Sequence, residues 1–138
     1  MTADELAETL GMQPHPEGGR YVETWRGRDD GGRSTATAIY FLLEAGERSH
    51  WHRVDADEIW LFHAGDPLAI DVAESASSTI ARHVLGTSVA RGEHPQVVVP
   101  AGAWQSASPL GSWTLVSCVV APGFEFEGFE LAPDGWTP

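Results

Sequence analysis

Hydrophobic and polar residues alternate along most of this chain in short runs, and this pattern predicts β-strands. Residues 20–26 alternate between Tyr21, Glu23 and Trp25 on one face and more mixed side chains on the other. Residues 34–44 are rich in Thr, Ile, Tyr, Phe and Leu, which predicts a strand buried on both faces for part of its length. Similar runs occur at residues 68–73, 79–85, 96–99, 103–107, 113–120 and 129–132.

One short helix is predicted before the strands. Thr2 followed by Glu5 has the form of a capping box, and Gly11 stands where the helix would end. The loop at residues 13–19 contains two prolines and two glycines, and its His15 and Glu17 are either ligand contacts or part of a solvated turn. Many short strands with almost no helix predict a β-sandwich or closed barrel, and 138 residues without repeat or linker predict a single domain.

Chemically versatile residues are densest at residues 46–65. In an extended strand His50 and His52 share one face, while Trp51 points the opposite way. Residues 55–57 predict a turn, after which Glu58 and Trp60 share a face of the next strand. We expect a hairpin of this kind to set His52 against Glu58 across one pocket.

The spacing of this segment resembles the first motif of the cupins, which are small jelly-roll β-barrels. That motif runs Gly, five residues, His-x-His, three or four residues, Glu, six residues, Gly, and it is met here at Gly46, His52, Glu58 and Gly65. The position of the second His is Val54, and an additional histidine, His50, stands two residues before His52. Residues 100–105 resemble the second motif, Pro-x-Gly-x-x-His, with Gln105 in place of the final His.

The resemblance extends over nearly the whole chain and points to one family of small, uncharacterised single-domain cupins. Its further matches are the segments His-Pro-Glu-Gly-Gly at 15–19, Trp-His-Arg-Val at 51–54, Asp-Glu-Ile-Trp at 57–60 and Ala-Pro-Gly-Phe at 121–124. The resemblance implies an all-β fold: a cupin jelly-roll β-barrel with a short N-terminal helix, in a single cupin domain at residues 1–138. Members of this family resemble nucleotide-sugar epimerases in shape, but a fold alone supplies no reaction. A homodimer is also implied by resemblance only.

The usual metal ligands of a cupin are incomplete in this sequence. Two of the four positions hold Val54 and Gln105; valine cannot bind a metal, and an amide oxygen is a weak ligand for zinc, nickel or iron. The sequence therefore predicts that neither a metal nor another cofactor is required. The alternative is a metal-dependent cupin, such as an isomerase or oxygenase, that uses His50 with His52 and Glu58.

A histidine beside a carboxylate can transfer protons at neutral pH, so His52 and Glu58 are the predicted catalytic residues. The predicted substrate-binding residues are His50, Trp60, Gln105, Tyr21 and Glu23. Sugar-modifying cupins without a metal resemble this arrangement, which implies epimerisation, isomerisation or dehydration of a sugar- or nucleoside-like metabolite. Two other interpretations stay open: a structural buried His52–Glu58 pair, and a non-catalytic metabolite-binding protein.

The net charge of the chain restricts the kinds of molecule that it is expected to bind. Eight basic and twenty acidic residues give a net charge of −12, which should repel nucleic acids and anionic membranes. Four arginines, at positions 20, 26, 28 and 33, leave open a small basic mouth for an anionic ligand. The lone Cys118 is predicted to pack in the core. The N-terminal segment lacks the features of a signal peptide, so a cytoplasmic protein is expected.

Overall fold

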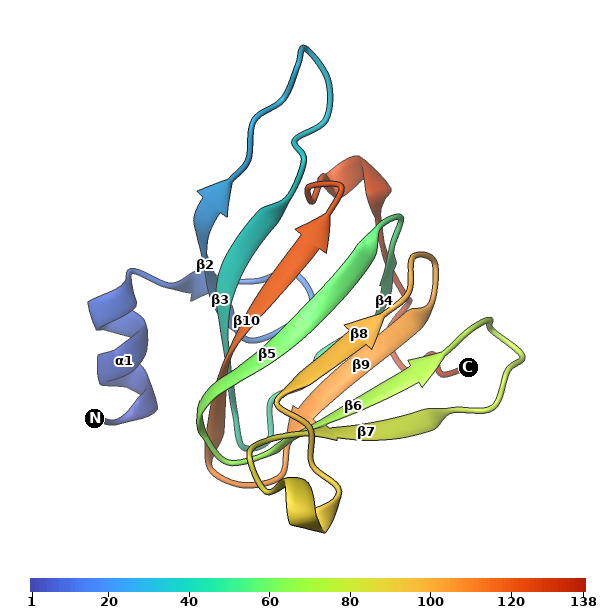
Figure 1. Cartoon of the computed structure of the whole chain (residues 1–138). Helices are drawn as coiled ribbons and strands as arrows, with labels where there is room; N and C mark the ends of the chain where they lie inside the picture. The colour runs from blue at the N-terminus through green and yellow to red at the C-terminus, as the bar shows by residue number, and fades with distance from the viewer.

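The N-terminal helix begins and ends at the residues that the sequence predicts. A computed structural model describes residues 1–138, and in it α1 spans Ala3–Leu10. The Thr2 hydroxyl accepts a hydrogen bond from the Glu5 backbone N–H at 3.1 Å, and Gly11 adopts the left-handed conformation with φ of 70°. The apolar side of α1 packs on Leu42 and Leu115, so the helix covers part of the outer face of one sheet (Figure 1).

Eleven strands form two antiparallel sheets (Figure 1). The six-stranded sheet has the order β1 (Gln13–Pro14), β2 (Arg20–Arg26), β3 (Thr37–Glu44), β10 (Trp113–Ala121), β5 (Asp57–Gly65) and β8 (Gln96–Val99). The five-stranded sheet has the order β11 (Phe129–Leu131), β4 (Ser49–Val54), β9 (Trp104–Pro109), β6 (Leu68–Ala73) and β7 (Ala81–Leu85). Two 3₁₀ turns, η1 (Val89–Arg91) and η2 (Phe126–Gly128), complete the fold. The predicted jelly-roll β-barrel with a short N-terminal helix is confirmed.

The inner faces of the two sheets fill one part of the barrel with apolar side chains. Phe41, Trp60 and Ile70 are each 1% exposed or less. The register explains why they meet: Cys118 of β10 lies opposite Ile39 on one side and Trp60 on the other, and every second residue of each strand shares this inner face. The same alternation carries Glu58 and Val120, which are paired across β5 and β10, into the part of the barrel that apolar side chains do not fill.

The predicted hairpin between the strands of the central motif is wrong. β4 pairs with β9 and β11, whereas β5 pairs with β10 and β8, so the two strands belong to different sheets. Asp55 and Ala56 carry the chain from one sheet to the other. A short turn between two runs of alternating residues does not reveal whether the strands pair or face each other across a core. His52 and Glu58 nevertheless line the same cavity between the sheets.

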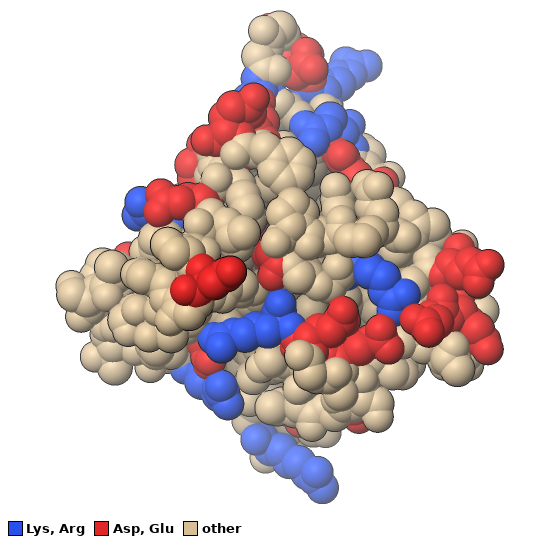
Figure 2. Space-filling view, turned by 180° about the vertical axis from the view of Figure 1, so that it is seen from behind, with Lys and Arg blue, Asp and Glu red and all other residues tan.

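None of the helices is both long enough and apolar enough to cross a membrane. Charged side chains of both signs are interspersed on the face seen in Figure 2, and the basic ones form no continuous surface there.

Candidate functional site

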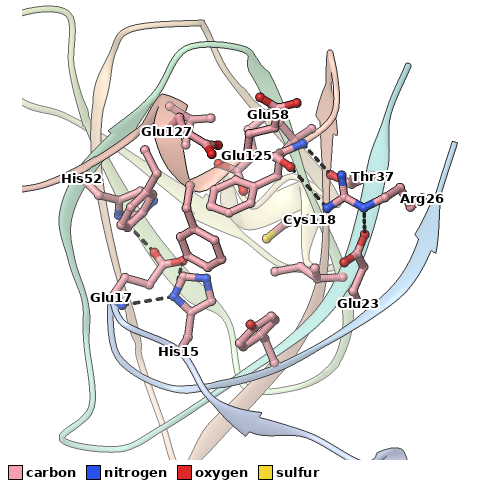
Figure 3. A pocket seen from close by; sticks show the side chains of 17 residues that line it. His15, Glu17, Glu23, Arg26, Thr37, His52, Glu58, Cys118, Glu125 and Glu127 are labelled. Atoms are coloured by element: carbon pink, nitrogen blue, oxygen red, sulfur yellow. Dashed lines mark hydrogen bonds and ion pairs between the residues drawn. The ribbon is translucent and has the colours of Figure 1, made fainter. Parts of the chain in front are cut away.

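A cavity of about 350 Å³ lies between the two sheets, beyond the packed apolar core (Figure 3). Strands from both sheets contribute to it, together with the loop before β2 and the segment between β10 and β11. Its lining consists of His15, Glu17, Tyr21, Glu23, Arg26, Thr37, Ile39, His52, Val54, Glu58, Cys118, Val120, Phe124, Glu125, Phe126, Glu127 and Phe129. This volume falls within the range of small-molecule sites.

His52 is held by one of its ring nitrogens. Its Nδ1 lies 2.7 Å from the carbonyl oxygen of His50, which can only accept, so Nδ1 carries the proton and donates it. Glu17 Oε2 also lies 3.0 Å from Nδ1. Burial lowers the pKa of His52, and the negative charge of Glu58 opposes that effect only in part. The ring is therefore neutral near pH 7, and its unprotonated Nε2, which has no hydrogen-bond partner in the chain, is open to the cavity.

Glu17 lies between His15 and His52 (Figure 3) and is 7% exposed. Burial raises its pKa to about 8, although a hydrogen bond from the Ser49 hydroxyl opposes this. Nδ1 of His15 accepts the Glu17 backbone N–H at 3.1 Å and lies 3.3 Å from Glu17 Oε1. Burial lowers the pKa of His15 to about 4, so the ring is neutral near pH 7. Because Nδ1 accepts the Glu17 N–H, the one proton of the ring is on Nε2. A protonated Glu17 carboxyl group satisfies all of these contacts.

Two adjacent glycines allow the Glu17 loop to lie this close to the barrel. A Cβ atom on Gly18 would overlap the Arg48 carbonyl oxygen, and one on Gly19 would lie 2.6 Å from the Phe41 ring. Both glycines have positive φ, at 110° and 74°. From the sequence alone, Glu17 was either a ligand contact or part of a solvated turn. The glycine pair that follows it was the signal for close packing.

Glu58 is oriented by two residues that lie behind it. Gln105 Nε2 donates to Glu58 Oε1 at 2.8 Å, and Trp60 Nε1 donates to Gln105 Oε1 at 2.9 Å. Burial is the main cause that raises the pKa of Glu58 to about 7, while the nearby His52 lowers it. Burial and the charge of Glu58 raise the pKa of the Cys118 thiol. Glu58 can therefore take up or release a proton near neutral pH.

Three of the predicted binding residues do not line the cavity. Trp60 and Gln105 lie in the second layer, where Trp60 packs on the Phe41 ring in the apolar core. His50 turns away, and its Nε2 lies 3.0 Å from the Pro133 carbonyl oxygen. The pairing of β4 with β9 shifts register between Ser49 and His52, and such a bulge breaks the alternation on which the prediction for His50 rested.

Tyr21 and Glu23 line the cavity beside His52 and Glu58. Tyr21 meets the edge of the His15 ring, with 4.6 Å between ring centroids. Glu23 forms an ion pair of 2.8 Å with Arg26. Four of the seven predicted site residues are therefore brought together by the fold, and their roles stay predictions.

An aromatic wall that the sequence analysis did not identify closes one side of the cavity. Phe124, Phe126 and Phe129 are in mutual contact, with ring centroids 5.0 to 6.2 Å apart. Phe129 also lies 5.5 Å from the His52 ring, and Phe126 is 54% exposed. Phenylalanines at positions 124, 126 and 129, interleaved with acidic residues, were the available signal.

The basic mouth that the sequence left open does not form. Arg20 pairs with Asp4 and Glu44, and Arg33 makes a two-bonded contact with Asp55. Of the four clustered arginines only Arg26 lines the cavity. It is engaged by Glu23, and it donates a hydrogen bond to the Phe124 carbonyl oxygen at 3.3 Å.

The donor set does not fit the metal centre of a typical cupin. Val54 lines the cavity with an aliphatic side chain, and the amide oxygen of Gln105 is already engaged by Trp60. His50 is turned toward Pro133. No three His, Cys, Asp or Glu side chains are arranged as a group that could hold a metal ion.

Comparison with known families identifies the chain by its sequence. The family model described as cupin superfamily (DUF985) matches residues 4–132. The chain belongs to this cupin family. A search of curated proteins finds no match.

Solved structures agree with this assignment. A hypothetical protein from Leishmania major is 35% identical with a TM-score of 0.88, and the match covers 99% of this cupin and 90% of that chain. A protein from Shewanella oneidensis is 40% identical with a TM-score of 0.90, covering 96% and 85% of the two chains. Oxalate decarboxylase from Bacillus subtilis is 14% identical with a TM-score of 0.66, covering 86% of this cupin and 29% of that enzyme. That last likeness concerns the fold alone.

Proposed function

We propose that this cupin is a metal-independent acid/base enzyme, an epimerase, isomerase or dehydratase, that acts on a small sugar- or nucleoside-like metabolite in the cavity. The observation that carries the proposal is that one cavity is lined by both an anchored, neutral His52 and a buried Glu58 whose pKa is raised to about 7. Each group has an orienting partner on its far side, so both reactive ends are directed by the protein before a ligand binds.

His52 is the base in this proposal. Its Nε2 removes a proton from a carbon next to a carbonyl group, and the C–H electron pair forms an enolate. The imidazolium that results is stabilised through Nδ1–H by the His50 carbonyl and by Glu17, which lie at 2.7 and 3.0 Å. Positioning of a base by a group on its other nitrogen is a recurring catalytic arrangement.

Glu58 is the acid. In its protonated form it returns a proton to the enolate, to carbon for an isomerisation or to a departing hydroxyl for a dehydration. His52 must be unprotonated and Glu58 protonated, and the directions of their pKa shifts allow both states together just below pH 7. Activity should therefore fall as pH rises through about 7.

Solvent-proton exchange tests this reaction directly. The metabolite that copurifies with the protein is identified by native mass spectrometry and is then incubated in D₂O with wild type, His52→Asn or Glu58→Gln. We expect wild type to incorporate deuterium next to the carbonyl group, and each variant to lose exchange by at least about a hundredfold. Binding without exchange in the wild-type protein would favour a non-catalytic metabolite-binding cupin.

Glu23→Gln should change binding of the same metabolite without a large change in melting temperature.

The proposal includes a homodimer as the working form. Trp25 and Val98 are 53% and 58% exposed on strands β2 and β8, and such side chains commonly contribute to contacts between subunits. Light scattering coupled to size-exclusion chromatography measures the mass directly, and a single species of the 14.9 kDa chain mass would contradict this part.

A further inference from the structure

The cavity is lined by many more acidic groups than basic ones. Five lining residues are glutamates and one is an arginine, and the glutamates are Glu17, Glu23, Glu58, Glu125 and Glu127. Burial raises the pKa of Glu17 to about 8 and that of Glu58 to about 7, so Glu17 is mainly protonated at neutral pH and Glu58 is protonated in part. The negative charge without an ion-pair partner therefore lies mainly on Glu125 and Glu127. The single arginine is engaged by Glu23 at 2.8 Å and by a backbone carbonyl. Glu125 and Glu127 form no ion pair within 4.0 Å, and Arg33, whose pKa the charge of Glu125 helps to raise, is held by Asp55.

The lining histidines do not balance this charge. Burial lowers the pKa values of both His15 and His52, so both are neutral near pH 7. A phosphate or carboxylate ligand would enter a site in which no free cation faces it. A positively charged ligand would instead be attracted by the carboxylates at the mouth over a distance of about one Debye length.

The aromatic wall of the cavity also favours a positively charged ligand. Phe124, Phe126 and Phe129 line the same cavity as Glu125 and Glu127, and aromatic faces attract ammonium groups through their quadrupoles. The wall is continuous with His52, which lines the cavity and is held through Nδ1, so its Nε2 makes no hydrogen bond within the chain. An acceptor that faces the cavity without a partner in the chain, together with an acidic and aromatic lining, is complementary to the N–H donors of an amine or to hydroxyl groups beside it.

We infer that the ligand of this cavity is a small cationic metabolite, one that carries a protonated amine on or beside a ring. The inference rests on the proposed function only in using the same cavity, and it narrows the substrate to amino-substituted compounds. Sugar nucleotides and other phosphorylated sugars are disfavoured, although the fold is shared with proteins that act on diverse small molecules.

Three ring compounds of similar size that differ in charge test the inference. Benzylamine, benzyl alcohol and benzoate are titrated into ¹⁵N-labelled protein at neutral pH, and shifts of cavity backbone amides give each Kd. We expect benzylamine to bind about tenfold more tightly than benzoate, with benzyl alcohol between them, and added salt to reduce the difference. The double variant Glu125→Gln/Glu127→Gln should lose most of this preference.

A matched control removes two carboxylates elsewhere. Glu8 and Glu74 are exposed and do not line the cavity, so Glu8→Gln/Glu74→Gln should keep the wild-type preference. Benzoate binding as tightly as benzylamine would overturn the inference and leave the acid/base proposal standing. A preference that survives in Glu125→Gln/Glu127→Gln would also overturn it, because the mouth would not be its source. If none of the three compounds shifts the cavity amides at millimolar concentrations, the inference of a cationic ring ligand fails, whereas the acid/base proposal is tested separately by solvent-proton exchange.

Discussion

The barrel interior has a packed apolar part and an open part that holds the cavity. The same strands form both parts, but the two differ in what fills the space between the sheets. In the packed part, β3, β5 and β10 contribute Phe41, Trp60 and Val116, each 1% exposed, and the side chains fill the space between the sheets. In the open part the same strands contribute Ile39, Glu58 and Cys118 to a cavity of about 350 Å³. One part is stabilised by burial of apolar surface, and the other holds ionisable groups at the cost of their desolvation.

Two successive side-chain hydrogen bonds mark the boundary between the packed part and the open part. Trp60 belongs to the apolar core, Gln105 accepts its N–H, and Glu58 accepts the amide of Gln105 at the cavity wall. The rigid core thereby fixes the orientation of a carboxyl group that would otherwise have several rotamers. The difference between the two parts predicts that substitutions in the packed part cost stability, whereas those in the open part change proton affinity and ligand binding.

The largest effect is expected in the packed part. Ile70 is fully buried on β6, so Ile70→Ala should reduce the free energy of unfolding by roughly 2–5 kcal/mol, because it leaves a cavity in a close-packed region. Urea denaturation followed by tryptophan fluorescence measures this loss. Thr79→Ala, at an exposed position between β6 and β7, is the control and should change stability little. A loss below about 1 kcal/mol for Ile70→Ala would mean that this part is not closely packed.

A substitution at the boundary between the packed and open parts should reduce the free energy of unfolding by an intermediate amount. Gln105→Leu leaves both the Trp60 N–H and Glu58 Oε1 without a partner, which should cost roughly 1–3 kcal/mol and raise the pKa of Glu58 further. In a double-mutant cycle, adding Trp60→Phe should cost less in the Gln105→Leu background than in wild type, since the donor is then already unpaired. Additive losses in the cycle would show that the chain of hydrogen bonds does not act as a unit.

The buried carboxyl groups should make stability depend on pH. The pKa values of Glu17 and Glu58 in the folded protein, about 8 and about 7, lie above the ordinary glutamate value, so the folded state holds protons that the unfolded state releases. Stability should therefore fall as pH rises from 6.5 to 8, by roughly 2 kcal/mol in total. His15 and His52 act oppositely, because their lowered pKa values make stability rise with pH, but that effect ends near pH 6.5.

Urea denaturation at a series of pH values measures the fall. Glu17→Gln should remove more than half of it between pH 6.5 and 8, and Glu58→Gln a smaller part, because the folded-state pKa of Glu17 is the higher. Glu74→Gln, on an exposed turn, is the matched control and should leave the slope unchanged. A wild-type stability that is flat across this range would mean that Glu17 and Glu58 are ionised in the folded state.

The sequence was sufficient for the strands and for part of the site because both depend on local alternation. The bounds of β2, β6 and β8, and both ends of α1, follow from side-chain period and capping residues. The assignment of His50 failed at a bulge, which is a property of the pairing of β4 with β9 and leaves no mark in the strand itself. The role of Glu17 stayed open, and Phe124 and Phe126 of the aromatic wall were not identified, because these residues lie in loops, where strand parity says nothing about side-chain direction.

The smallest effect is expected from removing metals. The first cupin motif assigns two ligand positions to Val54 and Gln105, and the Gln105 oxygen is engaged by Trp60, so only His52 and Glu58 remain as strong donors. Two protein ligands fall short of the three that catalytic zinc sites keep. Extensive treatment with a strong chelator should therefore leave the melting temperature and ligand binding of wild type unchanged.

A gain-of-binding variant shows that this measurement can detect a metal. Val54→His/Gln105→His restores the four usual donor positions, and zinc or nickel should raise its melting temperature in proportion to the logarithm of metal concentration above Kd. The same metals should leave wild type unaffected, because ligand number, not access to the cavity, limits binding there. Stoichiometric metal in untreated wild type, with binding lost on chelation and recovered on adding metal, would show that His50 turns inward to complete the site and that acid/base chemistry without a metal is the wrong assignment.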